Sequence, residues 1–169
     1  MDFSLTREQA LVKKMMQAFT ENEVKPIAAE IDRTHQYPAE NVAKLFKLGV
    51  MGMTVPKEYG GMGADQVAAA ICTEELAKAC ASTSDIVAGH TLCCVPILEH
   101  GNEEQKKKYL PMLTKGGVLG GMGITEPNAG SDASKSQTEA KLEGDHYVIN
   151  GSKIFITNGY VADVFVVFA

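Results

Sequence analysis

The strongest constraint on the fold is a change in hydrophobic period near Gly116 and Gly117. Before this pair, apolar residues recur at the 3.6-residue spacing of amphipathic helices. After it, apolar and polar residues alternate with the period of two that is typical of strands. Because a block of helices precedes a block of strands, the sequence predicts an α+β chain. We expect an all-α helical domain over residues 1–116. The first part of an antiparallel β-barrel or sheet domain, incomplete and truncated, should follow over residues 117–169.

Local signals predict where the helices begin. Thr6 and Gln9 have the spacing of a capping box, and Asn102 and Gln105 repeat it before the last helix. The segment between residues 54 and 63 contains too many helix breakers for a regular element and is predicted to be a surface loop. The expected helices cover residues 6–22, 26–31, 38–49, 65–80, 82–97 and 102–116.

The strand candidates follow in quick succession. Asn150-Gly151 is typical of a two-residue hairpin turn, so we expect residues 147–149 and 154–156 to pair around it. Residues 118–125 and a half-buried strand at 138–143, which ends at a Gly144-Asp145 turn, precede this hairpin. The last candidate, residues 161–169, is the most apolar. About four strands with an apolar open edge make an unfinished sheet, so we expect the sequence to be a fragment.

Composition narrows the classes of partner. Apolar residues make up 45% and charged residues 22% of the chain, as in soluble globular proteins, and the net charge of −5 leaves no basic face for nucleic acid. The first residues lack the pattern of a signal peptide, and no stretch approaches the length of a membrane span, so a cytoplasmic location is expected. The four cysteines lie on apolar helical segments without metal-ligand spacing, and neither disulfides nor a metal site are expected.

Two stretches carry the chemical information. Residues 122–132 can turn backbone N–H groups and two hydroxyls toward a polar ligand, and residues 149–157 can place an aromatic, an aliphatic and a threonine against a flat one. By composition alone, the first stretch also fits a strand end followed by a proline turn and an Asx or Ser turn. The glycines at 120–123 do not predict a nucleotide loop, because Glu126-Pro127 follows where a helix is required.

Other polar residues fit structural roles better than catalytic ones. The four histidines form no constellation with a serine or cysteine that indicates a nucleophile, and each fits a surface or packing role. Glu74 and Glu75, as neighbours on a helix, point about 100° apart and cannot act as a paired acid and base. The candidate chemistry therefore stays with the two stretches.

Both stretches resemble the acyl-CoA dehydrogenase family. Thr125-Glu126-Pro127 followed by Gly130-Ser131-Asp132 is similar to the family signature, and residues 149–158 resemble its second flavin-contacting strand at the expected separation. The resemblance extends through residues 55–61, 74–77 and 101–106, and so covers essentially the whole chain. It is nearest to the bacterial short-chain, butyryl-CoA type.

The resemblance implies a flavin site with FAD as the cofactor. Met122, Gly123, Ile124 and Thr125 would bond the polar edge of the isoalloxazine, and Ser131 would lie near the pyrophosphate and the bound thioester. Phe155, Ile156 and Thr157 would cover the rest of the ring, with the Thr157 hydroxyl near the hydride-accepting nitrogen. Many relatives carry tryptophan where this sequence has Phe155. Residues 90–95 would wall the acyl pocket, although ordinary helix packing explains any one of them equally well.

The implied reaction is α,β-dehydrogenation of an acyl-CoA in fatty acid metabolism. A carboxylate removes the α-proton while hydride passes to the flavin. In the short-chain branch, that base lies in a C-terminal helical domain, so no catalytic residue is assigned here, and Glu126 resembles a structural glutamate. The resemblance further implies electron-transferring flavoprotein as the electron acceptor and a homotetramer. The alternative is a non-catalytic module that binds an acyl-CoA or a partner protein.

Overall fold

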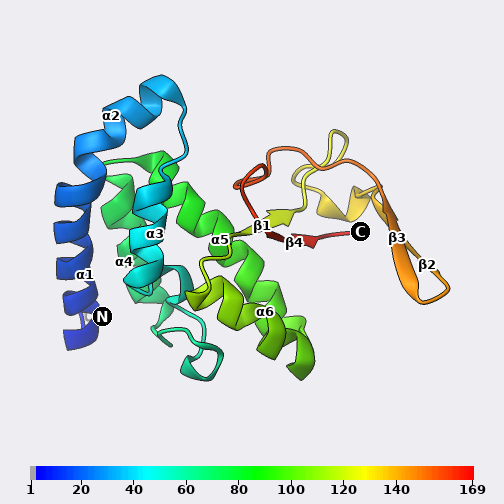
Figure 1. The fold of residues 1–169 in the computed structure, drawn as a ribbon, viewed down its shortest axis with the longest axis horizontal. Helices are drawn as coiled ribbons and strands as arrows, with labels where there is room; N and C mark the ends of the chain where they lie inside the picture. The colour runs from blue at the N-terminus through cyan, green and yellow to red at the C-terminus, as the bar shows by residue number, and fades with distance from the viewer. Residues whose placement is uncertain (1–2) are drawn as a thin grey trace.

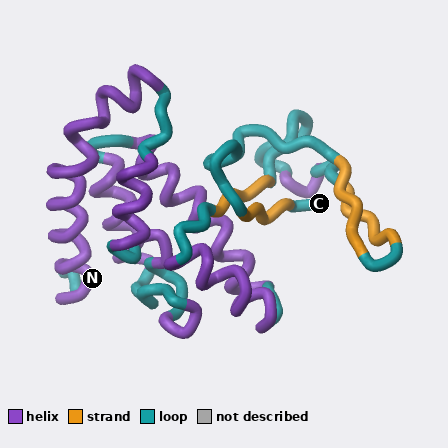
Figure 2. The backbone as a smooth tube through the Cα atoms, viewed as in Figure 1, coloured by secondary structure: helices purple, strands orange, loops and turns teal. Residues whose placement is uncertain are grey.

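In the computed structural model, which describes residues 3–169, a layer of helices precedes a smaller region of strands and loops (Figure 1). Figure 2 shows this division plainly, with the helices gathered on one side of the molecule and the strands on the other. The predicted order of helices followed by the start of a sheet region is confirmed. The α-helices are α1 (Arg7–Phe19), α2 (Lys25–Thr34), α3 (Ala39–Lys47), α4 (Gln66–Ala77), α5 (Ala81–His100) and α6 (Glu103–Lys115).

Two helices, α1 and α6, begin at the capping boxes that the sequence predicts. The Thr6 hydroxyl accepts from the Gln9 N–H at 3.2 Å while the Gln9 side chain accepts from the Thr6 N–H at 2.9 Å, and Asn102 with Gln105 forms the same box before α6. Short helical turns were not predicted, and two of them matter for the path of the chain. A π-helical turn (Thr20–Val24) joins α1 to α2, and a 3₁₀ turn (Lys57–Tyr59) lies within the expected loop.

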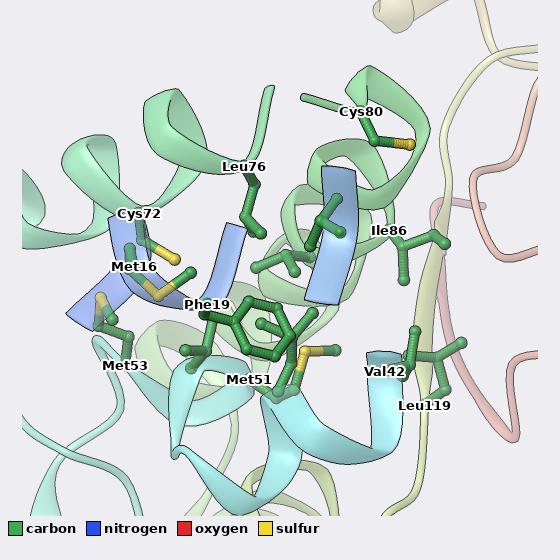
Figure 3. Packing of buried hydrophobic residues seen from close by; sticks show 14 of the residues in the cluster. Met16, Phe19, Val42, Met51, Met53, Cys72, Leu76, Cys80, Ile86 and Leu119 are labelled. Atoms are coloured by element: carbon green, nitrogen blue, oxygen red, sulfur yellow. The ribbon is translucent and has the colours of Figure 1, made fainter. Parts of the chain in front are cut away.

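The main core lies between α1, α3, α4 and α5 (Figure 3). Met16, Leu45 and Leu76 are fully buried there. A second cluster lies between α5 and α6, and the half-buried Val164 and Val166 of the last strand pack against it. The helical layer therefore supports the strand region directly.

The strands pair differently from the expectation. β1 (Gly120–Gly123) pairs in parallel with β4 (Val164–Val167), and β2 (Glu139–Glu143) pairs antiparallel with β3 (His146–Asn150). A parallel pair needs a long connection, and the β2–β3 hairpin lies within it. In Figure 1 this hairpin projects from the body. Thr138 is buried, but all of β2 is exposed, so the expected half-burial is wrong for residues 139–143.

The hairpin expected at Asn150-Gly151 is also wrong. Glu143 pairs with His146, so the expected Gly144-Asp145 turn is confirmed and closes the β2–β3 hairpin, whereas residues 151–156 form a loop instead of a strand. Phe155 and Asn158 have φ of 57° and 65°, in the left-handed region that a strand does not use. The loop returns to the end of β1, where the Ile154 N–H donates to the Thr125 carbonyl at 2.9 Å.

α5 corrects another expectation. Its 20 residues are long and apolar enough to cross a membrane by length and composition, whereas no stretch was expected to approach that length. The helix packs against α4, α6 and β1, and 44% of its apolar window is buried. Core helices of this kind meet the same criterion, so the finding is weak support for a span.

Asn158 joins the helical layer to the strand region. Its buried side-chain amide donates to the Ile86 carbonyl of α5 at 3.1 Å and to the Gly120 carbonyl of β1 at 3.1 Å. Asparagine is also one of the few residues that adopts a left-handed conformation readily.

We expect Asn158→Asp to lower the free energy of unfolding by about 3 kcal/mol, because a carboxylate tolerates the same backbone but cannot donate to two buried carbonyls. Urea unfolding followed by circular dichroism measures this. Asn22→Asp is the matched control, since the exposed Asn22 amide donates to a single carbonyl, and its effect should stay within about 0.5 kcal/mol. Equal effects at both positions would contradict the assignment.

Candidate functional site

A pocket of about 230 Å³ lies where α5, β1 and the loop after β3 meet. Six of the eight predicted cofactor-binding residues line it, together with two residues of α5. The lining residues are Gly89, Leu92, Met122, Ile124, Thr125, Phe155, Ile156 and Thr157. The structure thus brings the two stretches together, although 16 residues separate them in sequence.

The other two predicted residues lie outside this lining. Gly123 is buried, and a Cβ added there would lie 3.3 Å from a side-chain carbon of Lys153. Ser131 is exposed in the loop after β1. The backbone of Gly123 can therefore take part in the site without a side chain, whereas Ser131 is not placed near the pocket by the described residues.

One edge of β1 faces the pocket. The carbonyls of Leu119 and Gly123 accept from N–H groups in β4 and just after it, while the N–H and carbonyl of Gly120 bond to His90 and Asn158 on the opposite edge. Because backbone groups alternate along a strand, the N–H groups of Met122 and Ile124 lie on that second edge with those of Gly120. The N–H groups of Met122 and Ile124, two residues of the pocket lining, are therefore not used by β4 and are available as donors on that edge.

The loop residues form the other side of the pocket. Phe155 is 89% exposed, an unusual exposure for a large aromatic, and Ile156, the next residue, is half-buried. The Thr157 hydroxyl donates to the Asp85 carboxylate of α5 at 2.9 Å. Donors along one edge and flat apolar surface on the other side suit a planar heteroaromatic ring with a polar edge.

Glu126 ties the two stretches together beneath the pocket. Its carboxylate is 4% exposed and accepts from the Lys153 ammonium at 2.8 Å, the Ser136 hydroxyl at 2.6 Å and the Thr138 N–H at 2.9 Å. These donors, Lys153 first, hold the pKa of Glu126 far below its usual range. A carboxylate held so firmly as an anion is a poor base, which agrees with the structural role that the resemblance implies.

Lys153 was not singled out in the sequence. Its ammonium also donates to the Ile124 carbonyl at 3.0 Å and to the Ser136 hydroxyl at 2.8 Å, so it holds the chain just after β1 in place. The lysine lies within the second stretch, but its partner is 27 residues away. A buried lysine with a carboxylate partner is visible only once the chain is folded.

His90 has the packing role that the sequence analysis allowed for each histidine, but its hydrogen-bond partner was not predicted. It is fully buried, its ring meets Phe46 edge-on, and its Nδ1 accepts from the Gly120 N–H at 2.9 Å. Burial lowers the pKa of His90 to about 4, because a charged imidazole would lose its hydration. His90 is therefore a neutral packing residue, and Leu92 is the single member of residues 90–95 that lines the pocket.

None of the eight lining residues has a titratable side chain. The pocket, as formed by the described residues, can bind and orient a ring but cannot move a proton. The arrangement has the features of half of an active site, with the acid or base still to be supplied.

Comparison with known proteins agrees with this geometry. Residues 6–117 match the family model "Acyl-CoA dehydrogenase, N-terminal domain", and residues 121–169 match "Acyl-CoA dehydrogenase, middle domain". A short-chain specific acyl-CoA dehydrogenase of Clostridium acetobutylicum is 59% identical over 170 residues, which are 100% of this chain and 45% of the relative. The chain thus spans about 45% of that relative's length.

Two solved structures have the same fold. One, described as the electron transferring flavoprotein of Acidaminococcus fermentans, has a TM-score of 0.96 at 45% identity and covers 100% of this chain and 45% of its own. The other, an acyl-CoA dehydrogenase from Bacillus anthracis complexed with FAD, has a TM-score of 0.91 at 38% identity and covers 98% of this chain and 30% of its own.

We expect Glu126→Gln to lower the urea midpoint of unfolding, because it leaves the nearly buried Lys153 ammonium without an anion. Glu139→Gln is a suitable control, since the Glu139 pair with Lys141 is exposed and worth little. A Glu126→Gln midpoint equal to that of the control would show that the pair does not hold the two stretches together.

His90 predicts a stability that depends on pH. Its folded pKa of about 4 lies below the ordinary histidine value of 6.5, so this contribution is present above about pH 6.5 and is lost as the pH falls toward 4. Between pH 7 and pH 5, the free energy of unfolding should fall by about 2 kcal/mol more in the wild type than in His90→Asn, whose amide oxygen can still accept from Gly120. Parallel pH profiles for the two proteins would rule out this role.

Proposed function

Because the chain belongs to the acyl-CoA dehydrogenase family, we propose that it is the N-terminal portion of an FAD-dependent oxidoreductase that dehydrogenates short-chain acyl-CoA thioesters. The observation that carries the proposal is the pocket, which gathers six of the eight residues that the resemblance assigns to the flavin. The chain matches less than half of its relative's length, so the rest of the enzyme would supply the remaining site.

The residues of the pocket fit the flavin. The N–H groups of Met122 and Ile124, with the Thr125 hydroxyl, would donate to the polar edge of the isoalloxazine, and Phe155 and Ile156 would cover its face. The exposure of Phe155 supports this role, because a bound ring would remove that apolar surface from water. FAD, when bound, supplies the acceptor for the hydride that leaves the β-carbon of the thioester. Ser131 is assigned to the pyrophosphate and the thioester on the resemblance alone.

The base of the reaction lies outside these residues in our proposal. Glu126 is held as an anion by its donors, and the pocket lining offers no titratable group. Because these residues include no base, a second candidate function is that of a non-catalytic module that binds an acyl-CoA or a partner protein. Retention of flavin by the full-length protein distinguishes the two, since a non-catalytic module needs none.

The partners follow from the family and its relatives. We propose an electron-transferring flavoprotein as the electron acceptor, which the similarity to the Acidaminococcus fermentans structure supports. A homotetramer and a cytoplasmic role in fatty acid metabolism complete the proposal.

The test uses the full-length protein. Purified wild type should carry FAD with visible flavin absorbance. We expect Thr125→Ala to raise the FAD dissociation constant about 3- to 10-fold, because one neutral hydrogen bond is lost. Thr73→Ala, on the exposed face of α4, is the matched control and should bind FAD as the wild type does. A wild type that binds no FAD under any condition would overturn the proposal and favour the non-catalytic module.

A further inference from the structure

Two residues of α5 fix both branches of the Thr157 side chain. Asp85 and Gly89 are four residues apart and so share one face of the helix. The Thr157 hydroxyl donates to Asp85 at 2.9 Å, and a Cβ added at Gly89 would lie 2.6 Å from the Thr157 methyl carbon. The methyl group thus occupies the space that Gly89 leaves open, and the hydroxyl has a single orientation.

This orientation decides what Thr157 can offer to the pocket. A hydroxyl has one proton, and a carboxylate can only accept hydrogen bonds. Since the Thr157 proton is directed at Asp85, the Thr157 oxygen can present only an acceptor lone pair to the pocket that it lines. Asp85 itself is not part of that lining; it lies along a separate hollow of about 320 Å³ and acts on the pocket through Thr157.

We propose that Asp85 is a positioning residue that makes the Thr157 hydroxyl a hydrogen-bond acceptor toward the bound flavin. This inference rests on the proposed function, in which Thr157 lies near the hydride-accepting nitrogen. That nitrogen carries a lone pair in oxidised flavin and an N–H group in reduced flavin. A hydroxyl that accepts a hydrogen bond stabilises the reduced flavin through its N–H group and is repelled by the lone pair of the oxidised flavin. By fixing Thr157 as an acceptor, Asp85 therefore raises the midpoint potential of the flavin.

The charge of Asp85 has a second effect with the opposite sign. A carboxylate near an anionic reduced flavin lowers the midpoint potential through space, although the exposure of Asp85 screens this effect. The two contributions differ in one respect, because only the hydrogen-bond contribution needs the Thr157 hydroxyl, whereas the through-space charge effect does not. A double-mutant cycle with Thr157→Val, which removes the hydroxyl and keeps the shape, therefore separates them.

The experiment measures the midpoint potential of the flavin in four forms of the full-length holoenzyme: wild type, Asp85→Ala, Thr157→Val and the double variant. Alanine removes the acceptor and leaves the hydroxyl proton free to turn toward the pocket, whereas the carbonyl oxygen of an asparagine could still accept it. We expect Asp85→Ala to shift the potential to a more negative value when Thr157 is present than when it is replaced. Asp85→Leu, which also offers no acceptor, gives the same sign and takes the place of Asp85→Ala if that variant does not fold.

Asp32→Asn is the matched control for charge. Asp32 lies along the same hollow as Asp85 and has no hydrogen bond to Thr157, so its replacement should shift the potential equally with and without the Thr157 hydroxyl. An equal shift for Asp85→Ala in the two backgrounds would overturn the inference while leaving the proposed function intact. A full-length protein without flavin would overturn both.

Discussion

The arrangement of the site depends on the ion pair between Glu126 and Lys153. The pair is almost completely removed from water, and its members come from the two stretches that form opposite sides of the pocket. An unpaired ammonium or carboxylate in this buried position would carry a large desolvation cost. The loop after β3 can therefore pack against the chain after β1 only when Glu126 and Lys153 are paired. The extra donors from Ser136 and Thr138 bring the connection between β1 and β2 into the same unit.

α5 supports both sides of the site. Its buried His90 bonds to the start of β1, and Gly89, Leu92 and Asp85 meet the returning loop. A helix that packs on α4 and α6 is a rigid support, and rigid supports hold binding residues more precisely than loops do. The pocket therefore lies at the joint between a firm helical layer and a strand region with fewer contacts of its own.

Local signals predicted the parts of the fold that depend on neighbouring residues. The capping boxes at Thr6 and Asn102 were found because each closes over three residues. The parallel pairing of β1 with β4 was missed because about 40 residues separate the strands, and the Asn150-Gly151 signal was misleading because Gly144-Asp145 forms the turn. Most of the pocket lining was predicted through the family resemblance, whereas Lys153, His90 and Asp85 act through partners 27 to 72 residues away.

The close contact between Gly89 and Thr157 has a consequence for how this family's sequences can diverge. The space between α5 and the loop holds one methyl group, and Thr157 already fills it. A larger side chain at position 89 is compatible with the fold only when position 157 becomes smaller or the loop moves outward. Substitutions at positions 89 and 157 should therefore occur together in relatives. In a relative of unknown structure, the sizes of these two side chains would indicate how far the loop lies from α5.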